Sequence, residues 1–270
     1  YHPGAIEDAR NGTLAIDWQD EIFRTARMDN YNLGIRGGNE DVTYGIDANY
    51  LNQEGLVINS DYERFNLSTS ITTQASERLK VGATALLVRE NDNPVGEGSR
   101  GSLGVVSAAL YALPVGLGVK YPETYDDPKY PFDEALVGRY FNHRGSFGGF
   151  GDSSPNGGGL INPVAAAVEP EREILTTRNT LSSYLDYKIA EGLHLKVSGG
   201  AILSSSNNRQ FYNELINGSS TRDGERTAYT SNSEENSWQN SNILTFNREF
   251  NKHTLGVTGL FEQQYTTTTG

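Results

Sequence analysis

Strict alternation between apolar and polar residues is the feature that most constrains how this chain can fold. In one segment the apolar set is Val42, Tyr44, Ile46, Ala48 and Tyr50, and the polar set is Thr43, Gly45, Asp47 and Asn49. Side chains of a β-strand point alternately to opposite faces, so the segment predicts a strand with one apolar and one polar face. The apolar face must contact either a second sheet, as in a soluble sandwich, or lipid, as in a membrane barrel.

The same alternation recurs along the chain and predicts eight strands. They are expected at 30–36, 42–52, 62–74, 79–89, 174–188, 193–206, 236–248 and 253–268. Most reach the roughly 9–11 residues that a tilted strand needs to cross a bilayer, whereas globular strands typically have about 5–6. Before them, "DWQDEIFR" (17–24) predicts a short helix, because Trp18 and Ile22 are four residues apart.

The lengths of the connections alternate as well. Short turns are expected after the first, third, fifth and seventh strands, and longer connections after the second, fourth and sixth. Tight turns at one end and extended loops at the other are typical of outer-membrane barrels, and a soluble sandwich has no reason to adopt this order. The sequence therefore favours an all-β, antiparallel up-and-down transmembrane β-barrel segment, with about eight strands of a larger barrel and one very long outer loop.

This interpretation divides the chain into four parts. An outer loop with a short helix is expected over 1–27, barrel strands over 28–90, the long extracellular loop over 91–172, and further barrel strands over 173–270. The chain lacks an initiating Met and its first residues do not form a signal peptide, so we expect a piece of a longer protein. Two sheet edges, near 28–36 and 253–268, are expected to lack partners, so this piece alone should neither insert nor transport.

Composition agrees with a barrel that has a wet interior. Hydrophobic residues make up 36 % and the mean hydropathy is -0.54, yet 15 Tyr and 10 Phe make the chain too aromatic for a disordered protein. The net charge of -12 argues against a nucleic-acid partner, because no basic stripe is available to neutralise phosphates. The absence of Cys excludes a disulfide scaffold and Cys-based metal sites.

Several short motifs between residues 17 and 90 occur in a characteristic order. They are D-W-x-D-E-x-F-R (17–24), Y-N-L (31–33), G-G-N-E (37–40), Q-x-G (53–55) and L-K-V-G (79–82), and "NPVAAA" (162–167) follows before a later strand. This arrangement resembles the start of the barrel in SusC/RagA-type TonB-dependent transporters. The resemblance is specific over about a third of the chain.

The resemblance implies an outer-membrane, multi-pass importer of large nutrients, either glycans or peptides, and not an enzyme. A SusD-like surface lipoprotein would cap the barrel, and TonB would act through an N-terminal region that is not part of this sequence. The complete barrel would have about 22 strands around a plugged lumen.

Seven aromatic residues of the long loop are candidates for substrate binding, because aromatic rings can stack on sugars or enclose a peptide. They are Tyr125, Tyr130, Phe132, Tyr140, Phe141, Phe147 and Phe150. The alternative is that a loop of this length needs a small core of its own, which aromatic residues would supply.

A second aromatic set lies on the apolar faces of the strands. We predict that these residues anchor the barrel at the membrane interface, with ordinary sheet core as the alternative. They are Tyr31, Tyr44, Tyr50, Phe65, Trp238, Phe246 and Tyr265.

No cofactor is expected. The acidic stretch 125–128 and the pair Asp61 and Glu63 could bind calcium in the loops, although solvated surface charge is the simpler interpretation.

The Gly-rich segment 145–159 lacks the strand, Lys-Ser/Thr and helix of a phosphate-binding loop, so a flexible outer loop is expected. The four His are far apart and no catalytic set stands out.

Two alternatives to active import stay open at this point. The chain could belong to a soluble, multi-stranded glycan-binding or adhesion protein whose apolar face packs on a second sheet. It could also belong to a passive, porin-like channel.

Overall fold

The computed structural model describes residues 11, 16–96, 104–112, 118–126, 132–141, 162–212 and 226–270. In the described ranges, no helix is both long and apolar enough to cross a membrane. The strands are β1 (Met28–Gly38), β2 (Val42–Glu54), β3 (Asp61–Ser76), β4 (Leu79–Asn93), β5 (Glu171–Ala190), β6 (Leu193–Tyr212), β7 (Thr227–Phe250) and β8 (His253–Thr269). The helices are α2 (Trp18–Ile22), α3 (Val105–Tyr111), α4 (Pro163–Val168) and the 3-10 helix η1 (Glu134–Leu136).

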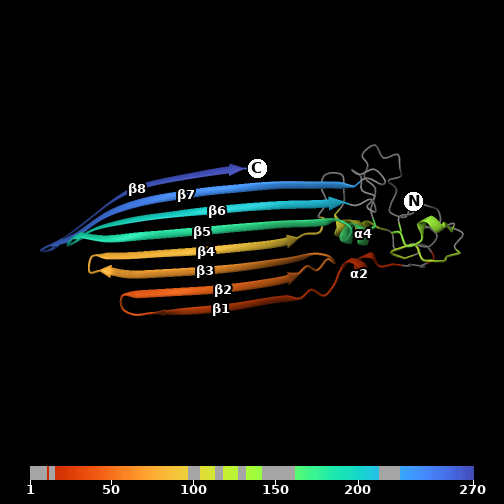
Figure 1. Ribbon diagram of the computed structural model, residues 1–270, viewed down its shortest axis with the longest axis horizontal. Coiled ribbons are helices and arrows are strands. Elements are labelled where there is room, and N and C mark those ends of the chain that lie inside the picture. The colour runs from red at the N-terminus through yellow and green to blue at the C-terminus, as the bar shows by residue number, and fades with distance from the viewer. Residues whose placement is uncertain are drawn as a thin grey trace.

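The eight strands form one antiparallel sheet in which each strand pairs with its neighbours in sequence, from β1 to β8. Figure 1 shows all short turns at one end of the sheet and all longer connections, with the helices, at the other. We call these the short-turn end and the loop end. The predicted up-and-down topology is confirmed, and all eight predicted strands are present.

Local chemistry explains the tight turns. In the turn between β1 and β2, the Asn39 side-chain oxygen accepts hydrogen bonds from the backbone N–H groups of Asp41 and Val42. Gly192 between β5 and β6 and Asn251 between β7 and β8 have positive φ angles of 77° and 54°. Gly and Asn adopt this left-handed conformation at lower cost than other residues, which allows chain reversal in two residues.

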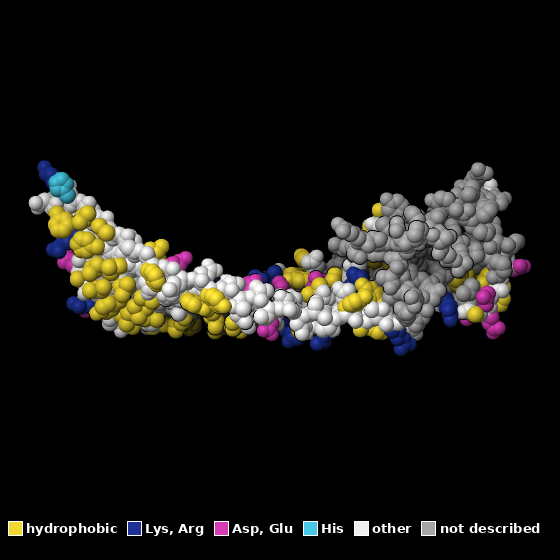
Figure 2. Space-filling view, turned by 90° about the horizontal axis from the view of Figure 1, so that it is seen from above, with side chains coloured by type: hydrophobic (Ala, Val, Ile, Leu, Met, Phe, Trp, Pro, Cys, Tyr) yellow, Lys and Arg dark blue, Asp and Glu magenta, His cyan; other side chains and the backbone are white. Residues whose placement is uncertain are grey.

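The two faces of the sheet differ as the alternation predicts. One face carries the odd-numbered residues of most strands, and the even-numbered residues of β2 and β7. Over the short-turn half of the sheet this face is apolar, and we call it the apolar face. The opposite face is the polar face. Figure 2 shows the apolar side chains gathered on the convex side of the curved sheet.

The buried core of the described chain lies at the loop end. Trp18 and Ile22 of α2 are buried together with residues of α3, α4 and the connection between β2 and β3. The helix predicted at 17–24 is therefore present, and the Asp17 side chain caps it by accepting a hydrogen bond from the N–H of Gln19. A small folded unit thus lies at the loop end of the sheet (Figure 1).

Candidate functional site

The apolar face is exposed, and this decides what the sheet can contact. Leu33, Trp238 and Phe261 lie on it, and 68 %, 46 % and 57 % of their surfaces are accessible. In the described part of the chain no second sheet covers this face, as it would in a soluble sandwich. Its large, continuous apolar area is typical of a surface that meets lipid or another protein.

All seven predicted interface aromatics lie on the apolar face. Tyr31, Tyr50 and Phe65 are paired across β1, β2 and β3, and the rings of Tyr31 and Tyr50 stack with their centroids 6.5 Å apart. Trp238 and Tyr265 are paired across β7 and β8. The other two, Tyr44 and Phe246, lie closer to the short-turn end of their strands. The structure shows their common face, and their role as membrane anchors stays a prediction.

Strands β5, β6 and β7 extend toward the loop end beyond the apolar band. The prediction placed the seventh strand at 236–248, but β7 begins at Thr227. Residues 230–237 of β7 are Ser, Thr, Asn and Glu, so this stretch has two polar faces. Alternation cannot reveal a strand that is polar on both sides, which explains why its start was missed.

The polar face carries a connected set of hydrogen bonds near the sheet edge at β1. The Asn49 side-chain amide donates to the side-chain oxygens of Asn30 (2.6 Å) and Asn32 (2.7 Å). Arg36 and Asp47 form an ion pair at 2.8 Å. These side chains are exposed or half-buried, as expected for the wall of a wet lumen.

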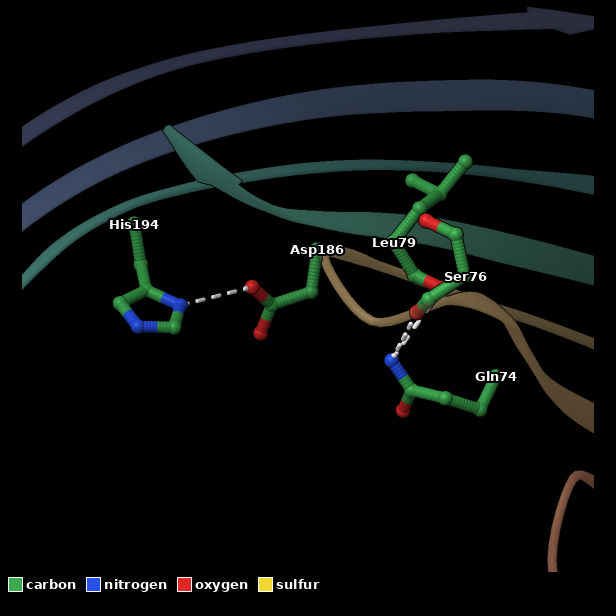
Figure 3. A network of polar contacts seen from close by, with 5 residues as sticks. All are labelled: Gln74, Ser76, Leu79, Asp186 and His194. Atoms are coloured by element: carbon green, nitrogen blue, oxygen red, sulfur yellow. Dashed lines mark hydrogen bonds and ion pairs between the residues drawn. The ribbon is translucent and has the colours of Figure 1, made fainter. Parts of the chain in front are cut away.

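At the short-turn end, five titratable groups share the polar face: Lys80, Asp186, Lys188, His194 and Lys196. Asp186 is paired with Lys80 on β4 and with Lys196 on β6. In Figure 3 the ring of His194 points to Asp186, and its Nδ1 lies 3.4 Å from a carboxylate oxygen. We call this set the short-turn charge cluster.

Asn162 organises the loop-end core. It is buried, and its side-chain oxygen caps α4 by accepting hydrogen bonds from the N–H groups of Val164 (3.0 Å) and Ala165 (3.2 Å). Its side-chain nitrogen donates to the carbonyls of Val119 and Phe141, both at 3.0 Å. The "NPVAAA" motif thus begins with a residue that joins two separate loop segments to a helix.

The predicted loop aromatics divide between core and surface. Phe141 is fully buried in the loop-end core, where it packs against Tyr121 with ring centroids 5.1 Å apart. Tyr125 and Phe132 pack on each other at 5.1 Å, and Phe132 is half exposed. Tyr130, Phe147 and Phe150 lie outside the described residues. At Phe141 the structure therefore agrees with the alternative of a loop core.

Tyr140 is held by two charged neighbours. Its hydroxyl donates a hydrogen bond of 2.6 Å to Glu169, and the Lys120 ammonium lies 4.6 Å from the ring centroid. Burial, together with the hydrogen bond to this carboxylate, raises the pKa of the Tyr140 hydroxyl. The residue therefore joins the segment around Lys120 to the end of α4.

Asp61 and Glu63, which were suggested above as calcium ligands, accept hydrogen bonds from neighbouring side chains. Asp61 accepts a hydrogen bond from Asn93 (2.9 Å), and Glu63 accepts one from the Tyr50 hydroxyl (3.2 Å). No group of three His, Asp or Glu side chains converges within the described ranges. Asp127 and the Gly-rich segment 145–159 lie outside them.

A cleft of about 600 Å³ opens at the loop end, where β4 and β5 diverge. Its lining includes Arg209, Glu173 and Tyr229, together with Pro94, which follows β4, and Ala166 of α4. Arg209 and Glu173 form an exposed ion pair at 3.5 Å. Sequence reasoning missed Arg209, Glu173 and Tyr229 because they lie in the parts of β5, β6 and β7 that extend beyond the predicted strands.

Taken together, a curved open sheet with an apolar convex face and a polar opposite face has the architecture of a β-barrel wall. No protein-family model matches the chain. The chain is 26 % identical over 268 residues to TonB-dependent receptor P3 of Formosa agariphila, an alignment that covers 98 % of this chain and 24 % of that receptor. Over 60 residues it is 37 % identical to TonB-dependent receptor SusC of Bacteroides thetaiotaomicron, covering 22 % of this chain and 6 % of SusC.

The fold is shared with a solved structure, the RagAB peptide transporter. The TM-score is 0.64 at 17 % identity, over 95 % of this chain and 26 % of that one. The predicted resemblance to SusC/RagA-type TonB-dependent transporters is thereby confirmed. The chain spans about a quarter of the length of receptor P3 and of the RagAB chain.

Proposed function

We propose that this chain is part of the barrel wall of an outer-membrane, TonB-dependent importer of large nutrients. The observation that carries the proposal is the exposed apolar face, which needs a lipid environment because the described chain provides no protein cover for it. The order of short turns and long connections supports the same environment. Transport would proceed by gated passage, without covalent chemistry.

We further propose a SusD-like lipoprotein as the partner at the loop end, and a glycan or a peptide as the cargo. The similarity to SusC and the fold shared with the RagAB peptide transporter support these assignments. Tyr125 and Phe132 are the described loop aromatics that could contact cargo, since their paired rings lie at the surface of the loop-end core.

The test is uptake by cells that express the complete receptor. We expect accumulation of fluorescently labelled oligosaccharides or peptides, loss of that accumulation when the receptor gene is deleted, and equal loss when TonB is disrupted. A surface lipoprotein should co-purify with the receptor in detergent. Uptake that persists without TonB would instead support the passive channel, and recovery of the protein in a detergent-free soluble fraction would support the adhesion protein.

A further inference from the structure

A cation without a counter-charge lies where the apolar part of the convex face ends. Arg89 of β4 is exposed, and its pairing with Phe65 places it on the apolar face, toward the loop end from Leu87. Among the described residues, Arg89 forms no hydrogen bond or ion pair. Glu63, the nearest carboxylate on this face by register, accepts a hydrogen bond from the Tyr50 hydroxyl instead. The border of the apolar area therefore carries an uncompensated positive charge.

Apolar side chains lie on the short-turn side of Arg89. Leu87 is the next residue of β4 on this face, and Leu203 of β6 belongs to the same cross-strand row as Leu87, through Asn179 of β5. The surfaces of Leu87 and Leu203 are 40 % and 45 % exposed. A molecule that contacts both leucines and Arg89 must combine a hydrocarbon part with a negative charge.

Unused hydrogen-bonding groups lie on the other side of Arg89, toward the loop end. Asn91 of β4 and Asn207 of β6 are both paired with Leu175 of β5, on the same face as Arg89. Their side-chain oxygens are buried and have no hydrogen-bond partner in the part of the chain that the structure describes. Buried polar atoms normally have a partner, so these two amides are available for further hydrogen bonds.

We propose that this border binds one molecule of a phosphorylated glycolipid from the outer leaflet of the membrane. We call it the headgroup site, and it consists of Leu87, Arg89, Asn91, Leu203 and Asn207. The phosphate would pair with the guanidinium of Arg89, whose planar fork matches the geometry of phosphate oxygens. Sugar hydroxyls would form hydrogen bonds with the two Asn amides, and acyl chains would pack on the two leucines.

The order of these side chains along the strands favours this ligand. From the hydrocarbon outward, a phosphorylated glycolipid presents acyl chains, phosphate and core sugars, and the headgroup site presents Leu, Arg and Asn in that order. A dissolved anion would explain the charge but not the exposed leucines, and a lipid without a sugar would leave the amides unused. This inference rests on the proposed function, because it takes the apolar face as the lipid side and the loop end as the outer side.

Native mass spectrometry of the complete receptor, purified in detergent and incubated with rough lipopolysaccharide, tests the headgroup site. The variant is Arg89→Gln. The matched control is Arg248→Gln, because Arg248 lies on the same face at the short-turn end. We expect Arg89→Gln to bind about tenfold less glycolipid, since it loses charge-assisted hydrogen bonds, and Arg248→Gln to bind an unchanged amount.

The chemistry of the glycolipid is varied in the same experiment. Removal of its phosphates should reduce binding to the unaltered receptor as far as Arg89→Gln does. Unchanged binding after either alteration, or equal losses with Arg89→Gln and Arg248→Gln, would overturn the proposal.

A third variant, Asn207→Leu, tests the contact with sugar and stays informative if Arg89→Gln does not fold. It keeps the cation, so it should still bind phosphatidylglycerol, an anionic lipid without a sugar. Its preference for rough lipopolysaccharide over phosphatidylglycerol should fall several-fold. All variants are compared as folded, heat-modifiable receptor. If the unaltered receptor binds both lipids equally well, any anionic lipid suffices and the proposal is wrong.

Nutrient uptake by cells that express the same receptors separates this inference from the proposed function. TonB-dependent uptake by a receptor that binds no glycolipid would refute the headgroup site and leave the import function intact. Bound glycolipid without TonB-dependent uptake would support the headgroup site and refute the import function.

Discussion

Asn162 uses all of its hydrogen-bonding capacity inside the loop-end core, with two bonds accepted and two donated. Replacement by Ala removes the helix cap, which costs about 0.5–2 kcal/mol. It also removes the Asn162 donor from two carbonyls. The Val119 carbonyl keeps the hydrogen bond from the N–H of Phe141, whereas the buried Phe141 carbonyl loses this donor, and a buried group left unsatisfied costs about 1–3 kcal/mol.

We therefore expect Asn162→Ala to loosen the loop-end core while the sheet stays intact. Limited proteolysis of the complete receptor should give earlier cleavage within 104–112, 118–126 and 162–170 than in the unaltered receptor, at unchanged heat-modifiability. Asn32→Ala, which removes a similar amide from the exposed polar face, serves as the control and should not alter cleavage. Equal protection of both variants would contradict the role assigned to Asn162.

Gly82 shows a second kind of residue-level constraint. The ring of Tyr184, its cross-strand partner, lies over Gly82, and an added methyl group would overlap the ring atoms. At Gly259 the same methyl group would meet nothing within 4 Å.

Gly82→Ala should accordingly lower the yield of folded receptor in the outer membrane, because the Tyr184 ring must leave its position. Gly259→Ala should be neutral. The measurement is the fraction of receptor that shows heat-dependent mobility on a gel. If Gly82→Ala folds as well as Gly259→Ala, Tyr184 moves at no cost.

At the scale of the strand, the alternating pattern was sufficient to predict most of the fold. Residues 42–50 and 79–85 alternate cleanly, and β2 and β4 contain them. The pattern failed where both faces are polar, as in the first part of β7, and it contained no information about which loop residues form a core. Those contacts join residues distant in sequence, such as Trp18, Val105 and Phe141, which no local period can pair.

The same alternation yields a test with adjacent residues of β4. Ala85 lies on the apolar face and Thr84 on the polar face, where its hydroxyl meets that of Ser182. Arg facing lipid at the bilayer midplane costs about 2–4 kcal/mol, whereas lumen-facing substitutions are tolerated. Ala85→Arg should reduce the amount of assembled receptor, and Thr84→Arg should reduce it far less. The reverse order would place lipid on the other face.

At the scale of the whole molecule, the apolar band covers less than the full height of the wall. Along β7, Leu244 lies within the band and Asn232 lies beyond it toward the loop end, on the same face of the sheet. This arrangement predicts which part of a single strand is accessible from outside the cell.

In intact cells, Asn232→Cys should react with a membrane-impermeant maleimide, and Leu244→Cys should not. Because the chain has no Cys, only the introduced thiols of this segment can be labelled. After the receptor is denatured, both positions should react, which confirms that each thiol is present. Labelling of Leu244→Cys in intact cells would show that this face does not meet hydrocarbon.

The stretch of β7 from 227 to 237 adds about 36 Å of strand at roughly 3.3 Å per residue. If the apolar band marks the bilayer, this upper rim stands in the space outside the cell as a continuation of the pore. In an importer of the proposed kind, a nutrient molecule would then be surrounded by protein well before it reached the depth of the hydrocarbon. The first selective contact between the nutrient and the protein would take place in this vestibule. Residues that line the vestibule can be replaced without disturbing the part of the barrel that lies in the bilayer.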